Sequence, residues 1–189
     1  MDVTSMGCAD MRSKPVPVGD DLARRIAGGD AHALEQAYDA YSAAVFRHAL
    51  AILGCAADAE DVLQDVFLKL AKRRGGAIAN LRAYLFAAAR NEAYSLLRRY
   101  RRERVGLEPD AVWSPERAEH MDPAEACALS RALNGLPPEQ REVVVLKVYE
   151  QLTFEEIGEL LNAPMNTVAS RYRYALHKMR CALAEANHD

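Results

Sequence analysis

Residues 136–180 decide the fold of this chain and read LPPEQREVVVLKVYEQLTFEEIGELLNAPMNTVASRYRYALHKMR. Two short helical patterns in this stretch are separated by a tight turn. The second pattern carries only basic charges, at Arg171, Arg173, Lys178 and Arg180. This arrangement is typical of a helix-turn-helix, in which a cationic second helix enters the major groove of DNA. The other interpretation is an ordinary amphipathic hairpin with a solvated basic face.

The turn between the two patterns has recognisable start and stop signals. Thr153 and Glu156 have the spacing of a capping box, which predicts a helix start. The sequence Asn-Ala-Pro at residues 162–164 predicts the end of that helix, because proline lacks a backbone donor and restricts the residue before it. A second helix is then predicted to begin between Pro164 and Thr167. Apolar residues at helical spacing predict its buried face, formed by Val168, Tyr172, Ala175 and Met179.

Composition places the whole chain among all-helical proteins. It has 189 residues, half of them apolar, and few stretches alternate as strands do. The net charge of −3 does not by itself indicate a nucleic-acid-binding protein. No apolar run is long enough to span a membrane. The cysteines are too scattered for a metal site or a disulfide framework, which favours a reducing cytoplasm; they are Cys8, Cys55, Cys127 and Cys181.

Residues 20–104 are predicted to form helices after a flexible tail at residues 1–19. Between Arg90 and Arg104 there are six arginines against two glutamates, with tyrosines interleaved. Such a helix suits DNA phosphates and unstacked bases, although cations also favour any helix C-terminus. Three residues in this half are expected to be helix N-caps: Asp30, Asp58 and Asn80.

An acidic segment separates this half from the helix-turn-helix. Residues 107–125 contain six acidic residues, one arginine and three prolines, which predicts an extended linker at residues 105–122. Asp122 followed by Pro123 then predicts the start of a new helix. The sequence therefore predicts an all-α protein with two small helical domains joined by a flexible acidic linker, the second domain covering residues 123–186.

Both domains resemble the extracytoplasmic-function (ECF) group of bacterial sigma factors, which contain only sigma regions 2 and 4. The first match is DAEDVLQDVFLKL at residues 58–70, followed by LRAYLFAAARNEAYSLLRRYRR at residues 81–102. The second is the stretch quoted above, up to Arg171. The resemblance implies region 2 at residues 20–104 and region 4 at residues 123–186. It also implies binding to core RNA polymerase, through its largest and second-largest subunits, and promoter-specific transcription initiation.

In the family, the acidic helix after the first break binds a coiled coil of the polymerase largest subunit. The resemblance places this role on Asp58, Glu60, Asp61, Gln64 and Asp65. The carboxylates could pair with arginines of the partner. The alternative is that they only stabilise the helix, because acidic residues are favoured at any helix N-terminus. The acidic linker is implied to thread the polymerase interior, or it serves only as a tether.

The next loop and helix match the part of the family that recognises the minus-10 element and captures a flipped base. The resemblance places Asn80, Tyr84 and Asn91 near the bases. It places Arg90, Arg98, Arg99, Arg101 and Arg102 on phosphates. The family usually has tryptophan where this chain has Tyr84, which keeps an aromatic face; a purely structural core role is the alternative for this tyrosine.

The second helix of the helix-turn-helix matches the reader of the minus-35 element. Its candidate residues are Asn166, Thr167, Ser170, Arg171, Arg173, Tyr174 and Lys178. The family pattern is close to Pro-x-Gly-Thr-Val-Lys-Ser-Arg. Here Asn166 replaces glycine and Ala169 replaces lysine, while Tyr174 and Leu176 occupy positions often held by arginine. These departures leave the minus-35 sequence and the strength of its contact open.

No catalytic residue, cofactor or metal site is expected, because the sequence has no phosphate-binding glycine loop, HExxH pair or nucleophile elbow. An alternative function is a helix-turn-helix regulator that binds duplex DNA as a dimer without polymerase. The acidic helix followed by an arginine-rich helix argues against it. A third is a sigma mimic that sequesters a regulator. The family also implies an anti-sigma factor as a further candidate partner.

Overall fold

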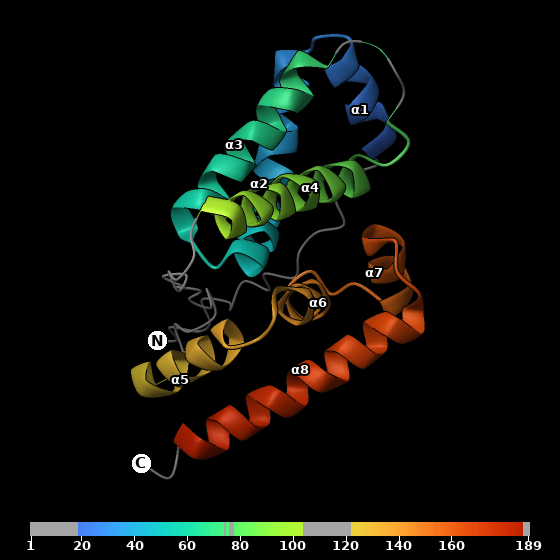
Figure 1. Ribbon diagram of the computed structural model, residues 1–189. Coiled ribbons are helices and arrows are strands. Elements are labelled where there is room, and N and C mark those ends of the chain that lie inside the picture. Colours follow the sequence, from blue (N-terminus) through green and yellow to red (C-terminus); the bar gives the residue numbers. More distant parts are fainter. Residues whose placement is uncertain (1–18, 74, 76–77, 104–121, 187–189) are drawn as a thin grey trace, which may run out of the picture.

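The computed structural model describes residues 19–73, 75, 78–103 and 122–186, and within them it contains helices and no strand (Figure 1). This confirms the predicted all-α class. Residues 1–18 of the predicted tail and residues 105–121 of the predicted linker lie outside the described residues. The helices are α1 (Gly19–Ala27), α2 (Ala31–Leu53), α3 (Ala56–Lys72), α4 (Leu81–Glu103), α5 (Pro123–Asn134), α6 (Pro138–Val148), α7 (Phe154–Leu161) and α8 (Met165–Ala186).

Most helix boundaries follow the predicted caps. The Asp30 side chain accepts hydrogen bonds from the first backbone amides of α2, and Gly54 ends this helix with a left-handed φ of 71°. The Asn80 carboxamide oxygen accepts from the Ala83 amide at 2.9 Å, at the start of α4. Asp122 caps α5 in the same way. Helix α1 begins at Gly19, inside the stretch predicted as tail.

The prediction for Asp58 is wrong, because α3 begins two residues before it. Its N-cap position is held by Cys55, directly after the glycine turn, so the helix starts at Ala56. Asp58 therefore lies in the first turn of α3, where its carboxylate accepts a hydrogen bond from the Tyr100 hydroxyl of α4 at 2.7 Å. The side chain joins two helices instead of capping one.

The helix-turn-helix forms as its signals predict. The Thr153 hydroxyl accepts from the Glu156 amide at 3.2 Å, and the Glu156 carboxylate accepts from the Thr153 amide at 2.7 Å. The hydrogen bond from the Thr153 amide is the main reason that the pKa of the Glu156 carboxyl lies below its usual value. Helix α7 ends at Leu161, Asn162 takes a left-handed φ of 50°, and α8 begins at Met165.

Gly158 makes the turn between α7 and α8 possible. A Cβ at this position would lie 2.8 Å from the backbone oxygen of Ala163. Gly158→Ala is therefore expected to lower the free energy of unfolding by about 1–3 kcal/mol, because the turn must open to relieve the overlap. Gly135→Ala is the control, since its Cβ would meet Arg131 oxygen at an ordinary 3.5 Å. Urea denaturation measures the free energy of unfolding of both variants. Equal losses in the two variants would contradict the close approach at Gly158.

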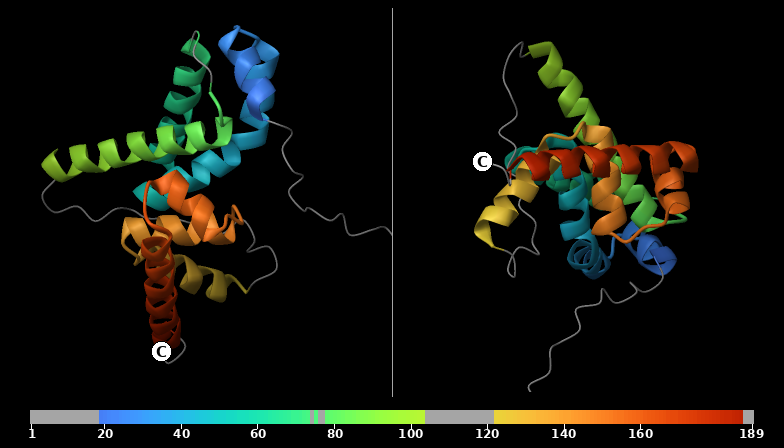
Figure 2. Two further views of the ribbon diagram at one scale, coloured as in Figure 1. Left: turned by 90° about the vertical axis from the view of Figure 1, so that its right-hand side faces the viewer. Right: turned by 90° about the horizontal axis from the view of Figure 1, so that it is seen from below.

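The two helical halves pack against one another (Figure 2). Helix α6 lies on α2, and α7 contacts α4. Four successive apolar residues of α6, at positions 143–146, are all buried. These four residues point to every side of one turn of α6, so this turn must be covered on every side. One side of α6 faces α7 and α8, and another faces α2.

Candidate functional site

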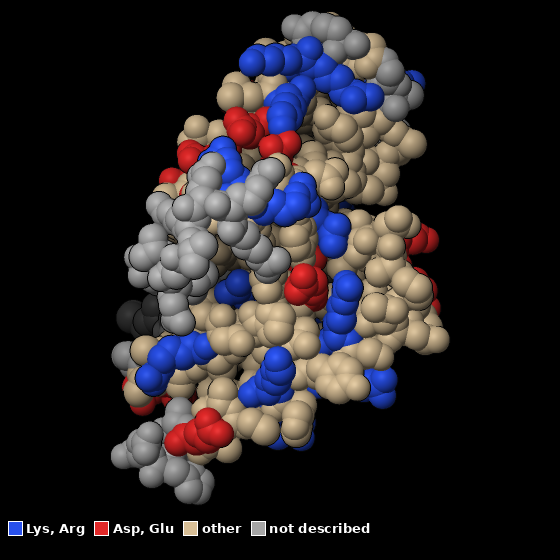
Figure 3. Space-filling model, in the orientation of Figure 1, with Lys and Arg blue, Asp and Glu red and all other residues tan. Residues whose placement is uncertain are grey.

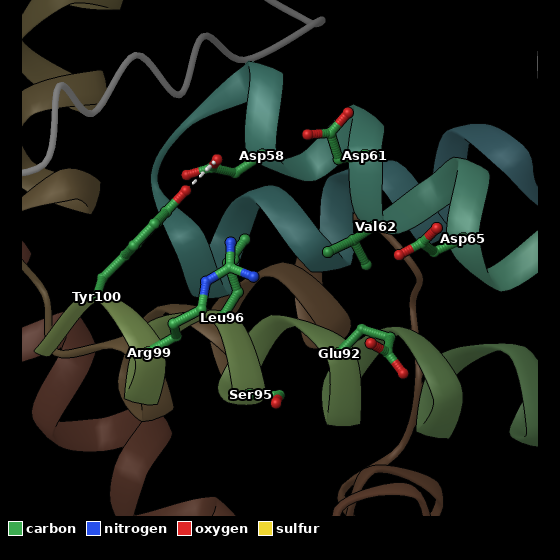
Figure 4. Close-up of a pocket in the computed structure, with 9 residues that line it drawn as sticks. All are labelled: Asp58, Asp61, Val62, Asp65, Glu92, Ser95, Leu96, Arg99 and Tyr100. Atoms are coloured by element: carbon green, nitrogen blue, oxygen red, sulfur yellow. Dashed lines mark hydrogen bonds between the residues drawn. The ribbon is translucent and has the colours of Figure 1, made fainter. Parts of the chain in front are cut away.

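Helix α3 presents an acidic face beside α4. Asp58, Asp61 and Asp65 line a hollow of about 260 Å³ between the two helices (Figure 4). Arg99 and Tyr100 of α4 line its other side. Asp61 and Asp65 are exposed, whereas Asp58 is half-buried by its bond to Tyr100. The hollow thus gathers three of the five residues predicted to bind polymerase.

The other two predicted residues, Glu60 and Gln64, lie beside them on the side of α3 that faces α2. They line a hollow shared with α2, next to Tyr38. A mainly apolar groove continues from Tyr38 along the same two helices. Tyr38 is 46% exposed and Leu68 is 52% exposed, which is unusual for large apolar side chains. The predicted residues therefore form one exposed face of α3, with α4 along one edge and α2 along the other.

Helix α4 holds the residues predicted for the minus-10 element in several different settings. Asn91, Arg98 and Arg99 are exposed. The Asn80 side chain is engaged as a helix cap. Tyr84 is half-buried, with the Arg73 guanidinium 5.3 Å from its ring centre. Arg90 is half-buried and bound to a carboxylate, as described below. The Arg101 and Arg102 side chains lie outside the described part of the structure.

Helix α8 turns a buried face inward and a polar face outward. Val168, Ala175 and Met179 are buried as predicted, and Tyr172 is half-buried against Phe154. Among the residues predicted for the minus-35 element, Asn166, Thr167, Arg173, Tyr174 and Lys178 are exposed, while Ser170 and Arg171 are half-buried. The Arg173 guanidinium donates to the Ser170 hydroxyl at 3.3 Å. Figure 3 shows Lys and Arg side chains over both halves of the molecule.

Comparison with known proteins identifies both halves. The model of Sigma-70 region 2 matches residues 37–103, and that of Sigma-70 region 4 matches residues 128–179. The ECF RNA polymerase sigma factor SigL of Mycobacterium tuberculosis is 30% identical over 165 residues, which cover 84% of this chain and 93% of SigL. The chain belongs to the ECF sigma factors. This ECF sigma factor directs promoter-specific transcription initiation with core RNA polymerase, and the dimeric regulator is not favoured.

Further relatives agree with this family. The ECF sigma factor SigK of Mycobacterium bovis is 27% identical over 179 residues, covering 87% of this chain and 92% of SigK. The sigma factor RpoE of Bartonella quintana, solved with the anti-sigma factor NepR, aligns with a TM-score of 0.63 at 26% identity, over 79% of this chain and 96% of RpoE. CnrH, solved with the cytosolic domain of CnrY, gives the same TM-score at 23% identity, over 88% and 97% of the chains, and shares the fold.

Sequence reasoning missed a polar cluster between the two regions of this ECF sigma factor. Glu142 of α6 is fully buried and accepts three hydrogen bonds from region 2. The donors are His48 Nε2 at 2.8 Å, Arg90 Nε at 3.1 Å and the Tyr94 hydroxyl at 3.2 Å. Burial, together with the Glu142 carboxylate, raises the pKa of Tyr94. The sequence offers one signal for a buried carboxylate here, because Glu142 stands directly before the apolar turn at residues 143–146.

Two further contacts border this cluster. Glu150, just after α6, accepts hydrogen bonds from Arg47 Nε at 3.1 Å and Nη2 at 2.8 Å. Its other carboxylate oxygen lies 3.8 Å from an Arg82 nitrogen of α4. Arg141 Nε donates to the Ala51 carbonyl near the end of α2, and burial lowers the pKa of this guanidinium. Arg141 thus satisfies a carbonyl that α2 itself leaves without a partner.

No helix of the described residues is long and apolar enough to cross a membrane. Among those same residues, His, Cys, Asp and Glu side chains nowhere gather in a group of three that could hold a metal ion.

Proposed function

We propose that this sigma factor divides its work among three helices. Exposed faces of α3 bind core RNA polymerase, α4 contacts the minus-10 element, and α8 reads the minus-35 element. Region 2 would comprise residues 20–104, and region 4 residues 123–186. The observation that carries this proposal is that the exposed acidic face and the two exposed basic faces lie on different helices. Polymerase and DNA can then be bound through different helices, and the two surfaces meet where Arg99 borders the hollow of Asp61 and Asp65.

The polymerase surface suits a helical partner with both apolar and basic side chains. Tyr38 and Leu68 give the α2/α3 groove an exposed apolar lining, and Glu60 and Gln64 supply polar groups nearby. Helices bind such grooves through apolar side chains at helical spacing. On the other flank, Asp61 and Asp65 can pair with basic residues of the same partner. This chemistry fits the coiled coil of the polymerase largest subunit.

For the minus-10 element, the exposed residues are the better candidates for direct contact. We assign Asn91 to base contacts, and Arg98 and Arg99 to phosphates, with Arg101 and Arg102 continuing the basic series in sequence. Asn80 instead shapes the start of α4, since its side chain holds the Ala83 amide. Tyr84 can offer only part of its ring to a base, because it is half-buried.

The minus-35 contact predicts a specific effect for Arg171. Its side chain belongs to the half of α8 that follows the turn, where a recognition helix contacts base edges. Arg171→Ala is expected to cost about 1–3 kcal/mol of promoter binding if the guanidinium reads a base. Arg180→Ala, near the far end of α8, is the control with the same charge change. Start-site mapping and the affinity of the holoenzyme for promoter DNA measure the effect. If Arg171→Ala and Arg180→Ala behaved alike, Arg171 would not be a base-reading residue.

The remaining assignments concern partners and place of action. We propose that the protein has no catalytic chemistry and acts in the cytoplasm, where polymerase and promoter DNA meet. An anti-sigma factor is a proposed further partner. Support comes from the similarity to RpoE, which was solved with the anti-sigma factor NepR.

Run-off transcription with purified core RNA polymerase and a genomic fragment library tests the proposal. Discrete start sites that appear only when the protein is added are the expected result. Alignment of the upstream DNA would then give both promoter elements. If no new start sites appeared but duplex DNA bound tightly without polymerase, the helix-turn-helix regulator would replace the proposed function.

A further inference from the structure

Helix α8 presents one row of side chains opposite its buried face. Val168, Ala175 and Met179 of this helix are buried. At about 100° per residue, the row that points away from them is formed by Asn166, Ser170, Arg173 and His177. Asn166 is the first member of the row and is exposed directly after the turn, in the part of a recognition helix that contacts base edges.

The polar groups of Asn166 have no role in holding the fold together. The Ser170 hydroxyl already accepts a hydrogen bond from the Arg173 guanidinium at 3.3 Å. The Asn166 carboxamide, in contrast, forms no hydrogen bond with any residue that the structure describes. It does not cap α8 either, since Asn166 is the second residue of this helix. Asparagine is less favourable than alanine inside a helix, so the fold alone does not account for this side chain.

The neighbours of Asn166 leave its carboxamide open to a partner. Side chains on a helix lean toward its N-terminus, so the residue three positions later covers part of position 166. That residue is Ala169, where the family pattern has lysine. A lysine would place a long cationic side chain over the amide, whereas alanine leaves this space free. Asn166 itself stands where the family pattern has glycine, so this chain carries a polar group where the pattern has no side chain.

The backbone beneath Asn166 is held by the turn between α7 and α8. The Ala163 amide donates to the Gly158 carbonyl at 2.9 Å, and the Thr167 amide donates to the Pro164 carbonyl at 2.8 Å. A side chain on a backbone that is already fixed loses less conformational freedom when it binds. The position of the carboxamide within the helix-turn-helix is therefore set before DNA is bound.

We propose that Asn166 reads an adenine in the major groove of the minus-35 element, so that this sigma factor prefers an A·T pair at one position there. This assignment rests on the proposed function, in which α8 lies in that groove. Adenine presents an acceptor, N7, beside a donor, the N6 amino group. Asn166 Oδ1 accepts from N6 while Nδ2 donates to N7, which satisfies both groups of the base.

The other three bases do not match this carboxamide. Guanine presents two acceptors, N7 and O6, at the same edge, so Asn166 Oδ1 would face an oxygen. Cytosine presents only a donor and thymine only an acceptor, so either base leaves one group of the carboxamide without a partner. A polar group that loses its water and gains no partner weakens binding. Discrimination therefore comes from the base edge and not from the phosphates.

Selection from a promoter library tests this assignment. The templates carry randomised DNA in the minus-35 region, upstream of a start site found with the unmodified protein. Transcription with core RNA polymerase is followed by sequencing of the productive templates. Asn166→Ala removes the carboxamide, and Asn166→Asp replaces it with a carboxylate of similar shape. His177→Ala is the control, because it removes another exposed side chain of the same row about three turns further along α8.

The unmodified protein is expected to select adenine at one position, at least about fivefold over each other base, the lower end for one bidentate pair. Asn166→Ala should lose the preference at that position alone. Asn166→Asp should change it to cytosine, because a carboxylate accepts from the cytosine amino group and is repelled by adenine N7. His177→Ala should keep adenine. Circular dichroism checks that every variant remains helical.

Four fixed promoters that differ only in the base pair at that position measure the size of the effect. The holoenzyme with the unmodified protein is expected to bind the adenine promoter most tightly, by fluorescence anisotropy of the labelled duplex. The holoenzyme with Asn166→Ala should bind all four alike. If the two holoenzymes showed the same ratios of affinity, the adenine assignment would be overturned.

The selected templates also separate this assignment from the proposed function. If the minus-35 region keeps preferred bases and neither Asn166 variant alters them, the adenine assignment fails while the minus-35 contact stands. If Asn166→Ala relaxes a position at which another base was preferred, adenine as the target is likewise overturned. If the unmodified protein prefers no base anywhere in this region, the assignment fails together with the proposed role of α8.

Discussion

Replacing both Asp61 and Asp65 with lysine is expected to remove most binding to core RNA polymerase. The two carboxylates are exposed one helical turn apart on α3. Like charges placed together at an interface cost several kcal/mol, which corresponds to a loss of roughly 100-fold or more in affinity. The fold should survive, because neither side chain belongs to the core. Co-purification with core enzyme and fluorescence titration measure the effect.

The matched control reverses two charges elsewhere on the molecule. Glu155 and Glu159 are also exposed and one turn apart, but they lie on α7 of region 4. Changing both to lysine alters the net charge by the same amount. If the α3 variant and the α7 variant retained polymerase equally well, the α3 face would not be the polymerase-binding surface.

Phe86→Ala is expected to lower the free energy of unfolding by about 3–5 kcal/mol, because it empties a fully buried aromatic site. Because Phe86 packs against region 4, the loss of stability should extend into that region. Amide hydrogen exchange should accelerate in α6 and α7 as well as in α4, since the cavity weakens the contact between the regions. Denaturation and exchange together measure both effects.

Phe67→Ala is the comparison for this effect. Phe67 is also buried, but it belongs to α3 and stacks edge-on against Tyr38 of α2. Its loss should accelerate exchange mainly within region 2. If Phe86→Ala left the α6 amides unchanged, the packing of region 4 on Phe86 would be contradicted.

Local signals in the sequence were sufficient for the helix-turn-helix. Its start depends on the capping box of Thr153 and Glu156, and its turn depends on residues 162–164. Both signals involve only residues that are close together in the sequence. The cap assigned to Asp58 failed because a competing start lay two residues earlier, and because its actual partner, Tyr100, is distant in sequence. Sequence patterns near Asp58 do not indicate a contact with a residue that lies 42 positions away.

The contact between the regions could not be predicted either, because it also joins residues that are distant in sequence. His48 and Glu142 are 94 residues apart, and nothing in either helical pattern specifies the other. The sequence indicated two domains separated by a linker, and their packing depends on how whole surfaces fit. The candidate DNA-binding residues were similarly assigned by position alone. The structure confirms the predicted Asn80 cap, which engages that side chain, and it adds that Arg90 is bound to Glu142.

The apolar turn of α6 at residues 143–146 makes the packing between the two regions depend on temperature. Residues 143–146 are buried partly by region 4 and partly by the packing of α6 on α2. Attraction between apolar surfaces weakens as water is cooled, because their hydration carries a large heat capacity. The packing between the regions should therefore loosen in the cold, while the hydrogen-bonded helices themselves remain intact.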